Sequence, residues 1–305
     1  MRVACIDIGT NSVLLLVAEA SGDGPRAVVE RATVTRLGQG VDATGELAPE
    51  ARERTLRCLA AYADEARALR VSRFLAVGTS AMRDARGGAD FAAEAAALLG
   101  GETPRVISGD EEAQLTFQGA LSGLSITPGP VTVFDIGGGS TELITREASG
   151  GALRAVSLNI GAVRLTERHL RADPPGPDEV AALRAAVVAA LAAVRPPPAG
   201  TPLVGVAGTV TTIAAVAHQV VPYDGERVHG SSLSQDEASE WAAKLVAMPL
   251  ADRRALPGME PKRADVIAAG AVLAEEVMRW AGATALTVSD RGVRWGLALR
   301  ALSGG

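Results

Sequence analysis

Aromatic residues and cysteines are scarce in this chain of 305 residues. Phenylalanine, tryptophan and tyrosine make up 3 % of it, so its core must be built from alanine, valine, leucine and isoleucine. Its two cysteines are too few for a disulfide framework and lack zinc-site spacing, and its three histidines share no metal-binding spacing. These absences argue against a disulfide-stapled or zinc-binding protein and favour a reducing compartment.

Runs of basic residues and long apolar runs are missing as well. The formal net charge is −5, and no cluster of lysine and arginine indicates a nucleic-acid partner. The alanine-rich segment 179–194 is too short and too charged to span a membrane. No charged leader with a cleavage site precedes the first predicted strand. We therefore expect a cytoplasmic protein that binds neither nucleic acid nor membrane.

The motifs G-x-x-x-x-G-K-[ST] and G-x-S-x-G are also absent, which argues against a P-loop enzyme and a nucleophile-elbow hydrolase. What the chain has instead is a glycine hairpin. Residues 131–134 are apolar and β-branched, three glycines occupy 137–139, and Ile144 and Thr145 continue as a second strand. The glycine amides and the hydroxyls of Ser140 and Thr141 have the chemistry of an anion nest.

Two acids flank this hairpin, Asp135 before the glycines and Glu142 after them. They would repel a bare phosphate, so a divalent cation is the natural intermediary between the acids and an anion. The alternative is a glycine-rich hairpin that binds nothing.

The same pattern opens the chain. Strand 2–7 ends in Asp7, residues 8–12 form a turn, and 13–19 is a second strand. Asp135 lies 128 residues after Asp7, and Gly208-Thr209 lies 130 residues after Gly78-Thr79. Landmarks that recur in the same order predict a duplicated unit of strands and helices, each copy with helices packed on a mixed sheet.

The length favours two domains of about 150 residues. The glycine-, proline- and serine-rich connector 122–130 places the boundary, giving domains 1–125 and 126–305. Further predicted strands are 27–37, 73–77, 105–107, 203–207 and 286–288, and predicted helices are 48–69, 90–99, 233–248 and 263–281. A helix follows 108–110 with Ser108 or Asp110 as its N-cap, and another passes through Trp295 and Leu299.

Segments 7–12, 135–142 and 208–209 resemble the three loops of the actin/Hsp70/sugar-kinase superfamily. Blocks at 107–113, 229–230, 257–259, 263–265 and 289–292 are similar to the exopolyphosphatase/guanosine-pentaphosphatase family in its short, two-domain form. The resemblance implies an α/β fold of two ribonuclease-H-like (actin-like ATPase) domains related by duplication, with a cleft between them. It also implies removal of a terminal phosphate by water.

The resemblance assigns roles to single residues. Glu112 matches the family's catalytic base, and its neighbour Glu111 cannot share its helical face. Both acids could instead be solvated residues that the helix dipole favours. The metal, Mg²⁺ or Mn²⁺, would bind Asp7, Asp135 and Glu142, although Asp7 could simply bond the hairpin amides. The predicted phosphate- and substrate-binding residues are Gly9, Thr10, Asn11, Ser12, Arg83, Gly137, Gly138, Gly139, Ser140, Gly208 and Thr209.

Several functions stay open at this point. The first is hydrolysis of inorganic polyphosphate, and its nearest rival is hydrolysis of guanosine pentaphosphate in the stringent response. Few aromatics are available to stack on a base, which favours polyphosphate. A superfamily ATPase or sugar kinase fits the block around Glu112 poorly, and a non-catalytic nucleotide-binding regulator or actin-like scaffold is a further alternative. The helices after Ser232 could form a homodimer face or pack in a core.

Overall fold

The computed structural model describes residues 1–22, 24–148 and 152–302. The chain divides into two compact units. Unit 1 comprises Met1–Ser122 and Gly292–Gly305, and unit 2 comprises Gly123–Arg291.

The division corrects one predicted boundary. The first crossing, at Ser122 and Gly123, falls inside the predicted connector, but the predicted second domain extended to residue 305. The last helix, α13 (Val293–Leu302), belongs to unit 1 instead. Its Trp295 and Leu297 are buried in one cluster with Val3 and Cys5 of the first strand. A helix is assigned to the core that buries its apolar face, and its position in the sequence does not reveal that core.

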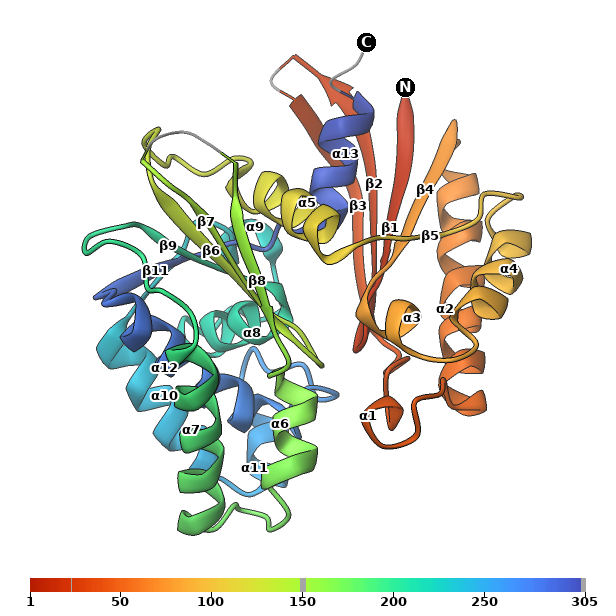
Figure 1. Ribbon diagram of the computed structural model, residues 1–305. Coiled ribbons are helices and arrows are strands. Elements are labelled where there is room, and N and C mark those ends of the chain that lie inside the picture. The colour runs from red at the N-terminus through yellow and green to blue at the C-terminus, as the bar shows by residue number, and fades with distance from the viewer. Residues whose placement is uncertain (23, 149–151, 303–305) are drawn as a thin grey trace. The chain divides into compact units, whose positions relative to one another are not determined.

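Unit 1 is built on a five-stranded sheet of order β3-β2-β1-β4-β5 (Figure 1). β1 pairs antiparallel with β2, β2 with β3, and β1 pairs parallel with β4, which pairs parallel with β5. The strands are β1 (Arg2–Ile8), β2 (Ser12–Ser21), β3 (Gly24–Val34), β4 (Arg73–Gly78) and β5 (Arg105–Val106). The other helices of the unit are α1 (Val41–Thr44), α2 (Pro49–Ala68), α3 (Ser80–Asp84), α4 (Gly88–Leu98) and α5 (Gly109–Leu121).

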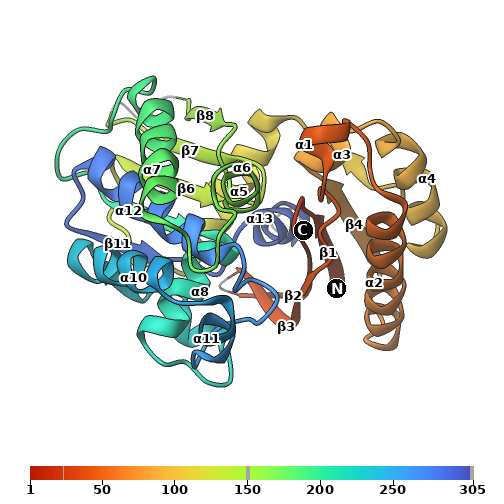
Figure 2. The ribbon, with the colours of Figure 1, turned by 90° about the horizontal axis from the view of Figure 1, so that it is seen from below.

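The two faces of this sheet bury different residues of β1, because side chains alternate along a strand. Ala4, Ile6 and Ile8 join the cluster formed with α2, α3 and α4, and α2 lies beside α4 (Figure 2). Val3 and Cys5 face α5 and α13. Asp7 shares the alternation of Val3 and Cys5, so its carboxylate lies on the α13 side.

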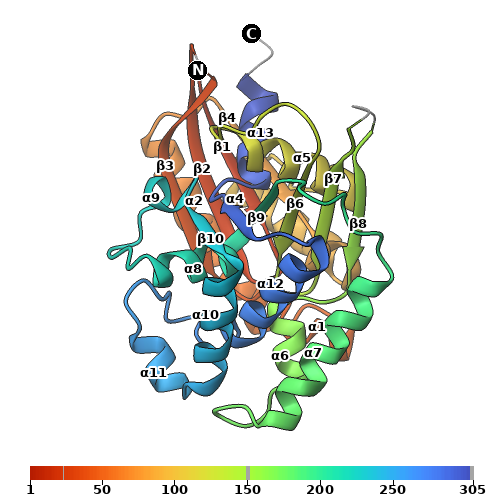
Figure 3. The same ribbon diagram turned by 90° about the vertical axis from the view of Figure 1, so that its left-hand side faces the viewer.

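Unit 2 has a six-stranded sheet of order β10-β11-β9-β6-β7-β8. Figure 3 labels the strands of this sheet other than β11. Its run β8-β7-β6-β9-β11 repeats the order β3-β2-β1-β4-β5 of unit 1, with the same antiparallel and parallel pairs. The strands are β6 (Val131–Ile136), β7 (Thr141–Arg146), β8 (Arg154–Leu158), β9 (Leu203–Val206), β10 (Ser232–Ser234) and β11 (Ala285–Val288). The repeated order confirms the predicted duplication.

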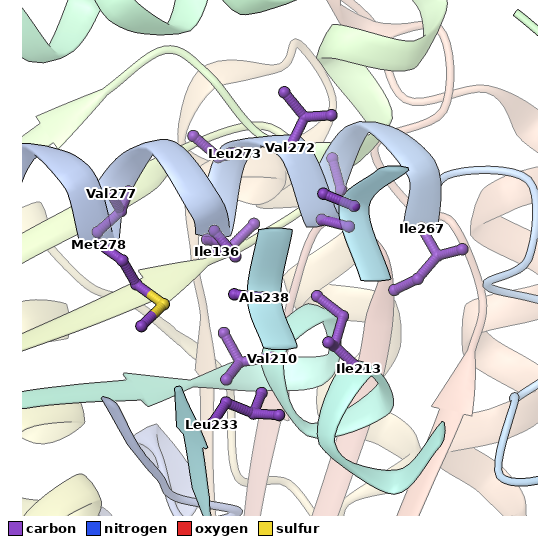
Figure 4. Packing of buried hydrophobic residues seen from close by; sticks show 14 of the residues in the cluster. Ile136, Val210, Ile213, Leu233, Ala238, Ile267, Val272, Leu273, Val277 and Met278 are labelled. Atoms are coloured by element: carbon purple, nitrogen blue, oxygen red, sulfur yellow. The ribbon is translucent and has the colours of Figure 1, made fainter. Parts of the chain in front are cut away.

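Helices of unit 2 gather around α12. Side chains of α12 pack with Val210 and Ile213 of α8, Ile136 of β6 and Ala238 of α10 (Figure 4). The helices are α6 (Ala162–His169), α7 (Pro177–Ala192), α8 (Ala207–Ala217), α9 (Gly225–Val228), α10 (Gln235–Ala247), α11 (Leu250–Ala255) and α12 (Ile267–Ala281).

Local sequence signals placed most elements correctly. Pro49 begins α2, Ser108 caps α5, and Ser234 caps α10 in a capping box with Glu237. The third strand ends at Val34, three residues before its predicted end, because the following residues turn to bond the first hairpin. No counterpart was predicted for strands β8 and β10 or for helices α1, α6, α8, α9 and α11. No helix within the described residues is both long and apolar enough to cross a bilayer.

Candidate functional site

The first hairpin, residues 9–12, connects β1 to β2 in unit 1. The Gly9 amide donates to the Ser12 carbonyl at 3.0 Å and closes the turn. The carbonyl of Asn11 accepts from the amides of Thr35 and Arg36, at 3.0 and 2.9 Å. The Thr10 and Ser80 hydroxyls share a hydrogen bond of 2.7 Å, which ties the hairpin to the start of α3. The hairpin is therefore held from two sides.

Asp7 ends β1 immediately before this hairpin. Its Oδ1 is shut off from solvent and accepts no hydrogen bond from any described residue. Burial raises the pKa of Asp7 from 3.8 to about 7, although the nearby Arg294 guanidinium acts in the opposite direction. The alternative role of Asp7, accepting hydrogen bonds from the hairpin amides, is therefore not filled by its Oδ1. A buried carboxylate oxygen without a donor is suited to a cation.

Arg83 and Glu112 meet in unit 1, although 29 residues separate them. Arg83 lies in the last turn of α3, and its Nη1 donates to Glu112 Oε2 at 3.2 Å and to the Ile107 carbonyl at 3.2 Å. The Glu112 side chain is 14 % exposed. A carboxylate and a guanidinium, both predicted for the reaction, therefore form one pair.

Glu111 has a different partner. Its Oε1 accepts from Arg105 Nη2 at 2.7 Å, and Arg300 lies 3.6 Å away. Arg105, which donates this bond, lowers the pKa of Glu111 below its ordinary value. Adjacent acids in the first turn of α5 thus point to different partners, as their helical spacing predicts.

The second hairpin, residues 137–140, repeats the turn of the first. The Gly137 amide donates to the Ser140 carbonyl at 3.0 Å. The carbonyl of Gly138 accepts from the amides of Val163 and Arg164, at 3.0 and 3.1 Å. Arg164 Nε donates to the Gly139 carbonyl at 2.7 Å. The first turn of α6 therefore fixes the hairpin carbonyls.

The hairpin amides differ from the carbonyls. The N–H groups of Gly138 and Gly139 donate to no acceptor among the described residues. Gly161, just before α6, lets the backbone there lie close to the second hairpin, since a Cβ built at Gly161 would lie 2.5 Å from the Gly138 carbonyl oxygen. Fixed carbonyls and two amides without acceptors are the arrangement of an anion-binding nest.

Asp135 and Glu142 lie directly opposite each other, as register partners on β6 and β7. Residues that are opposite on an antiparallel pair project to the same face. Glu142 is buried, and its Oε1 accepts from Ser157 Oγ at 2.8 Å. The hairpin thus carries two carboxylates on one face.

Gly208 and Thr209 were predicted as a loop after a strand, but the structure places them in the first turn of α8. Thr209 Oγ1 donates to the Ile136 carbonyl at 3.3 Å, linking α8 to the end of β6. The Arg263 guanidinium lies against Gly208, where a Cβ would be 1.8 Å from Nη1. Gly208 therefore allows the Arg263 guanidinium to approach the backbone near the end of β6.

Sequence reasoning missed Arg164 and Arg263. Arg263 lies in one of the blocks that carry the family resemblance, which was an available signal. Arg164 lies on α6, a helix that was not predicted, so nothing in its local sequence marked it.

The acids fit a hard cation as oxygen donors. Asp7 has a buried oxygen that no described residue bonds, and Asp135 with Glu142 forms a pair on one face. Within the described part of the chain, however, no three His, Cys, Asp or Glu side chains gather in a metal-binding group. At either place, water or substrate oxygens would have to complete the coordination, which is usual for Mg²⁺.

The chain is similar to proteins that are already described. A family model, the Ppx/GppA phosphatase family, matches residues 16–304. Exopolyphosphatase 2 of Mycobacterium tuberculosis is 42 % identical over 316 residues, covering 98 % of this chain and 98 % of that relative.

Solved structures agree. The crystal structure of an exopolyphosphatase-like protein has a TM-score of 0.90 at 36 % identity, covering 98 % of this chain and 97 % of the other. The Aquifex aeolicus member of the Ppx/GppA family has a TM-score of 0.83 at 33 % identity, covering 99 % and 98 %. Together with the repeated sheet order, these likenesses confirm the predicted fold class of two actin-like α/β domains.

Proposed function

Because the chain belongs to the Ppx/GppA phosphatase family, we propose that it is an exopolyphosphatase, which releases the terminal phosphate of inorganic polyphosphate. The observation that carries this proposal is the pair formed by Glu112 and Arg83, 3.2 Å apart. One member is suited to accept a proton from water, and the other to hold a phosphate oxygen. The name of the Mycobacterium tuberculosis relative supports polyphosphate as the substrate.

In the proposed reaction, water attacks the terminal phosphorus and its proton passes to the Glu112 carboxylate. The bond from that phosphorus to the bridging oxygen breaks, and the shortened polyphosphate leaves with the electron pair. Phosphoryl transfer of this kind depends mainly on positioning and on charge stabilisation. Arg83 supplies charge next to the base, since its guanidinium already contacts Glu112.

The two hairpins would bind phosphate oxygens through different groups. The first offers the hydroxyls of Thr10 and Ser12 and the amide of Asn11, and the second offers the amides of Gly138 and Gly139. The hydrogen bond from Thr209 to the Ile136 carbonyl places Gly208 and Thr209 beside the end of β6, the strand that leads into the second hairpin.

Mg²⁺, or Mn²⁺ in its place, is the proposed cofactor. Asp7 would offer its buried oxygen in unit 1, and Asp135 and Glu142 would offer theirs in unit 2. When bound, such a cation neutralises charge on phosphate oxygens. It would also let carboxylates and a polyanion occupy the same region.

The scarcity of exposed aromatic side chains favours polyphosphate over a guanine-containing substrate. Of the described aromatic residues, Tyr223 alone is strongly exposed, at 48 %, and its hydroxyl donates to Asp290 at 2.6 Å. Stacking on a guanine base requires an accessible ring, so we favour polyphosphate. The experiment tests guanosine pentaphosphate as the rival substrate.

The proposal is tested by phosphate release. The protein is incubated with Mg²⁺ and polyphosphate, guanosine pentaphosphate or ATP, and parallel samples contain a chelator or Mn²⁺. We expect release from polyphosphate, loss of release with the chelator, and recovery with Mn²⁺. No release from polyphosphate or guanosine pentaphosphate would overturn the phosphohydrolase assignment, and release from guanosine pentaphosphate alone would transfer it to that substrate.

A further inference from the structure

One row of polar side chains crosses three strands of unit 2. Asp135 of β6 lies opposite Glu142 of β7, and Glu142 lies opposite Ser157 of β8. Residues that are directly opposite on antiparallel strands project to the same face of the sheet. Two acids and a hydroxyl therefore lie next to one another on one face of the second sheet.

The corresponding row of unit 1 has different chemistry. Asp7 lies opposite Leu14, and Leu14 lies opposite Ala32. The acid before the hairpin is thus present in both units, whereas the second acid of the row and the hydroxyl beside it occur only in unit 2. This joint occurrence indicates that the hydroxyl serves the second acid.

The Ser157 hydroxyl contacts that acid directly. Ser157 Oγ donates to Glu142 Oε1 at 2.8 Å, a normal length for a hydrogen bond between a hydroxyl and a carboxylate. Glu142 is buried, whereas Ser157 is exposed. A glutamate side chain has several rotatable bonds, and a donor at one carboxylate oxygen restricts them. Ser157 therefore holds the Glu142 carboxylate in one orientation, on the face that Asp135 shares.

Stability of the sheet does not account for this row. Like charges that are directly opposite on two strands destabilise the pair, and burial adds a desolvation cost for a charged side chain. An apolar residue satisfies the same position in unit 1, where Leu14 occupies it. Two opposed acids with a donor that orients one of them are the arrangement expected around a cation.

We propose that Ser157 is a positioning residue for the divalent cation that Asp135 and Glu142 hold. It acts through its hydrogen bond to Glu142 and does not itself contact the cation. The inference rests on the cofactor of the proposed function and adds a residue to its site. Partners that orient a ligand side chain contribute about 10- to 100-fold to metal affinity.

The test removes one hydroxyl from each face of the same sheet. Ser157→Ala removes the donor to Glu142, and Ser157→Thr keeps a hydroxyl there. Thr145→Val is the matched control. Thr145 shares a hydrogen bond of 3.1 Å with Thr132, and it lies three residues after Glu142 on β7, so it projects to the opposite face.

Three quantities are measured for each variant. Binding of Mn²⁺ to the protein alone is followed by electron paramagnetic resonance, which needs no turnover. The Mg²⁺ concentration that gives half-maximal phosphate release from polyphosphate is determined separately, and thermal unfolding reports stability.

We expect Ser157→Ala to raise the dissociation constant for Mn²⁺ about 10-fold or more, and to raise the half-maximal Mg²⁺ concentration in parallel. Its kcat at saturating Mg²⁺ should stay within about threefold of wild type. Its Tm should change little, because water can replace a donor at an exposed position. Ser157→Thr should bind Mn²⁺ within about threefold of wild type.

The control should behave in the opposite way. Thr145→Val leaves the buried hydroxyl of Thr132 without its partner, so we expect a Tm lower by a few degrees and an unchanged affinity for Mn²⁺.

Three results would overturn the inference. They are an unchanged affinity for Mn²⁺ in Ser157→Ala, an equal loss of affinity in Thr145→Val, and a wild-type protein that binds no Mn²⁺ although it releases phosphate. Wild-type protein that releases no phosphate, but binds Mn²⁺ in a way that depends on Ser157, would overturn the proposed function and support the inference. The two failures are therefore distinguishable.

Discussion

The two hairpins of this protein share a turn and differ in their surroundings. In each, a glycine amide donates to a serine carbonyl at 3.0 Å, after a strand that ends in aspartate and isoleucine. In each, the carbonyl of a central residue accepts two amides from the segment that follows the third strand. The turn is therefore a property of the duplicated unit.

The acids differ between the hairpins. Asp135 faces Glu142 across the strands, whereas the register partner of Asp7 is Leu14. Asp7 has a buried oxygen that no described residue bonds, while Glu142 accepts a hydrogen bond from Ser157. The bracing segments differ too, because a loop with a strained Arg36 supports the first hairpin and the helix α6 supports the second.

Within the proposed function, we interpret this difference as a division of roles between the units. Unit 1 carries the proposed base, Glu112, with Arg83 beside it, and its hairpin keeps the side chains of Thr10 and Asn11. The hairpin of unit 2 has glycines in their place and offers bare glycine amides with two carboxylates. A duplicated scaffold can thus keep one turn while its two copies acquire different chemistry.

The largest expected effect tests whether the reaction depends on unit 1. Glu112→Gln should lower turnover by about 10²–10⁴-fold, the contribution of a positioned base, because an amide cannot accept the proton from water. Substrate binding should persist, since the glutamine carbonyl can still accept from Arg83. Phosphate release and equilibrium binding of polyphosphate measure the two quantities.

Glu111→Gln is the control for this variant. Glu111 lies next to Glu112 but pairs with Arg105, whose side chain is 61 % exposed, and exposed pairs contribute little. We expect turnover close to wild type. Equal losses in both variants, or normal turnover in Glu112→Gln, would remove Glu112 from its proposed role.

The next test compares the bracing of the hairpins. Gly161→Ala should lower the free energy of unfolding by about 1–3 kcal/mol, since a Cβ there meets backbone atoms of Gly138 and Gly139 that cannot move aside. Gly38→Ala should cost less, because its Cβ meets the Cγ2 methyl of Thr10, 2.3 Å away. Denaturant midpoints report both changes.

A rescue variant checks the cause at the first hairpin. Thr10→Ser removes the methyl group and keeps the hydroxyl that bonds Ser80. It should restore most of the stability that Gly38→Ala loses, and it should leave Gly161→Ala unimproved. If Gly38→Ala proved as damaging as Gly161→Ala, the two hairpins would be braced alike and the comparison would fail.

The smallest expected effect concerns the acid of the first hairpin. Burial raises the pKa of Asp7 to about 7, so the folded state binds its proton more tightly than the unfolded state does. Stability from this group is therefore full below pH 4 and is lost as the pH rises through about 7. Without divalent metal, the Tm of wild type should fall by a few degrees between pH 5 and pH 8, relative to Asp7→Asn.

Two other acids do not titrate in this window. Backbone hydrogen bonds lower the pKa values of Asp173 and Glu179, so these groups stay ionised above pH 5. Added Mg²⁺ should reduce the wild-type loss at pH 8 if the ion meets the Asp7 carboxylate. Parallel pH profiles for wild type and Asp7→Asn would show that the buried oxygen carries no such penalty.

Local sequence determined the parts of the site that depend on neighbours in the chain. Apolar β-branched runs that end in an acid and glycines placed both hairpins, and Ser108 placed the start of α5 with its two glutamates. The order of landmarks revealed the duplication. These features follow from strand propensity, turn chemistry and capping, which act over a few residues.

Only the tertiary structure decided the rest. It assigned α13 to unit 1, gave Glu111 to Arg105 and Glu112 to Arg83, and buried an oxygen of Asp7. It also forced Arg36 into a left-handed conformation against the first hairpin. Each of these depends on burial or on a partner distant in sequence, and packing between elements, not local propensity, determines both.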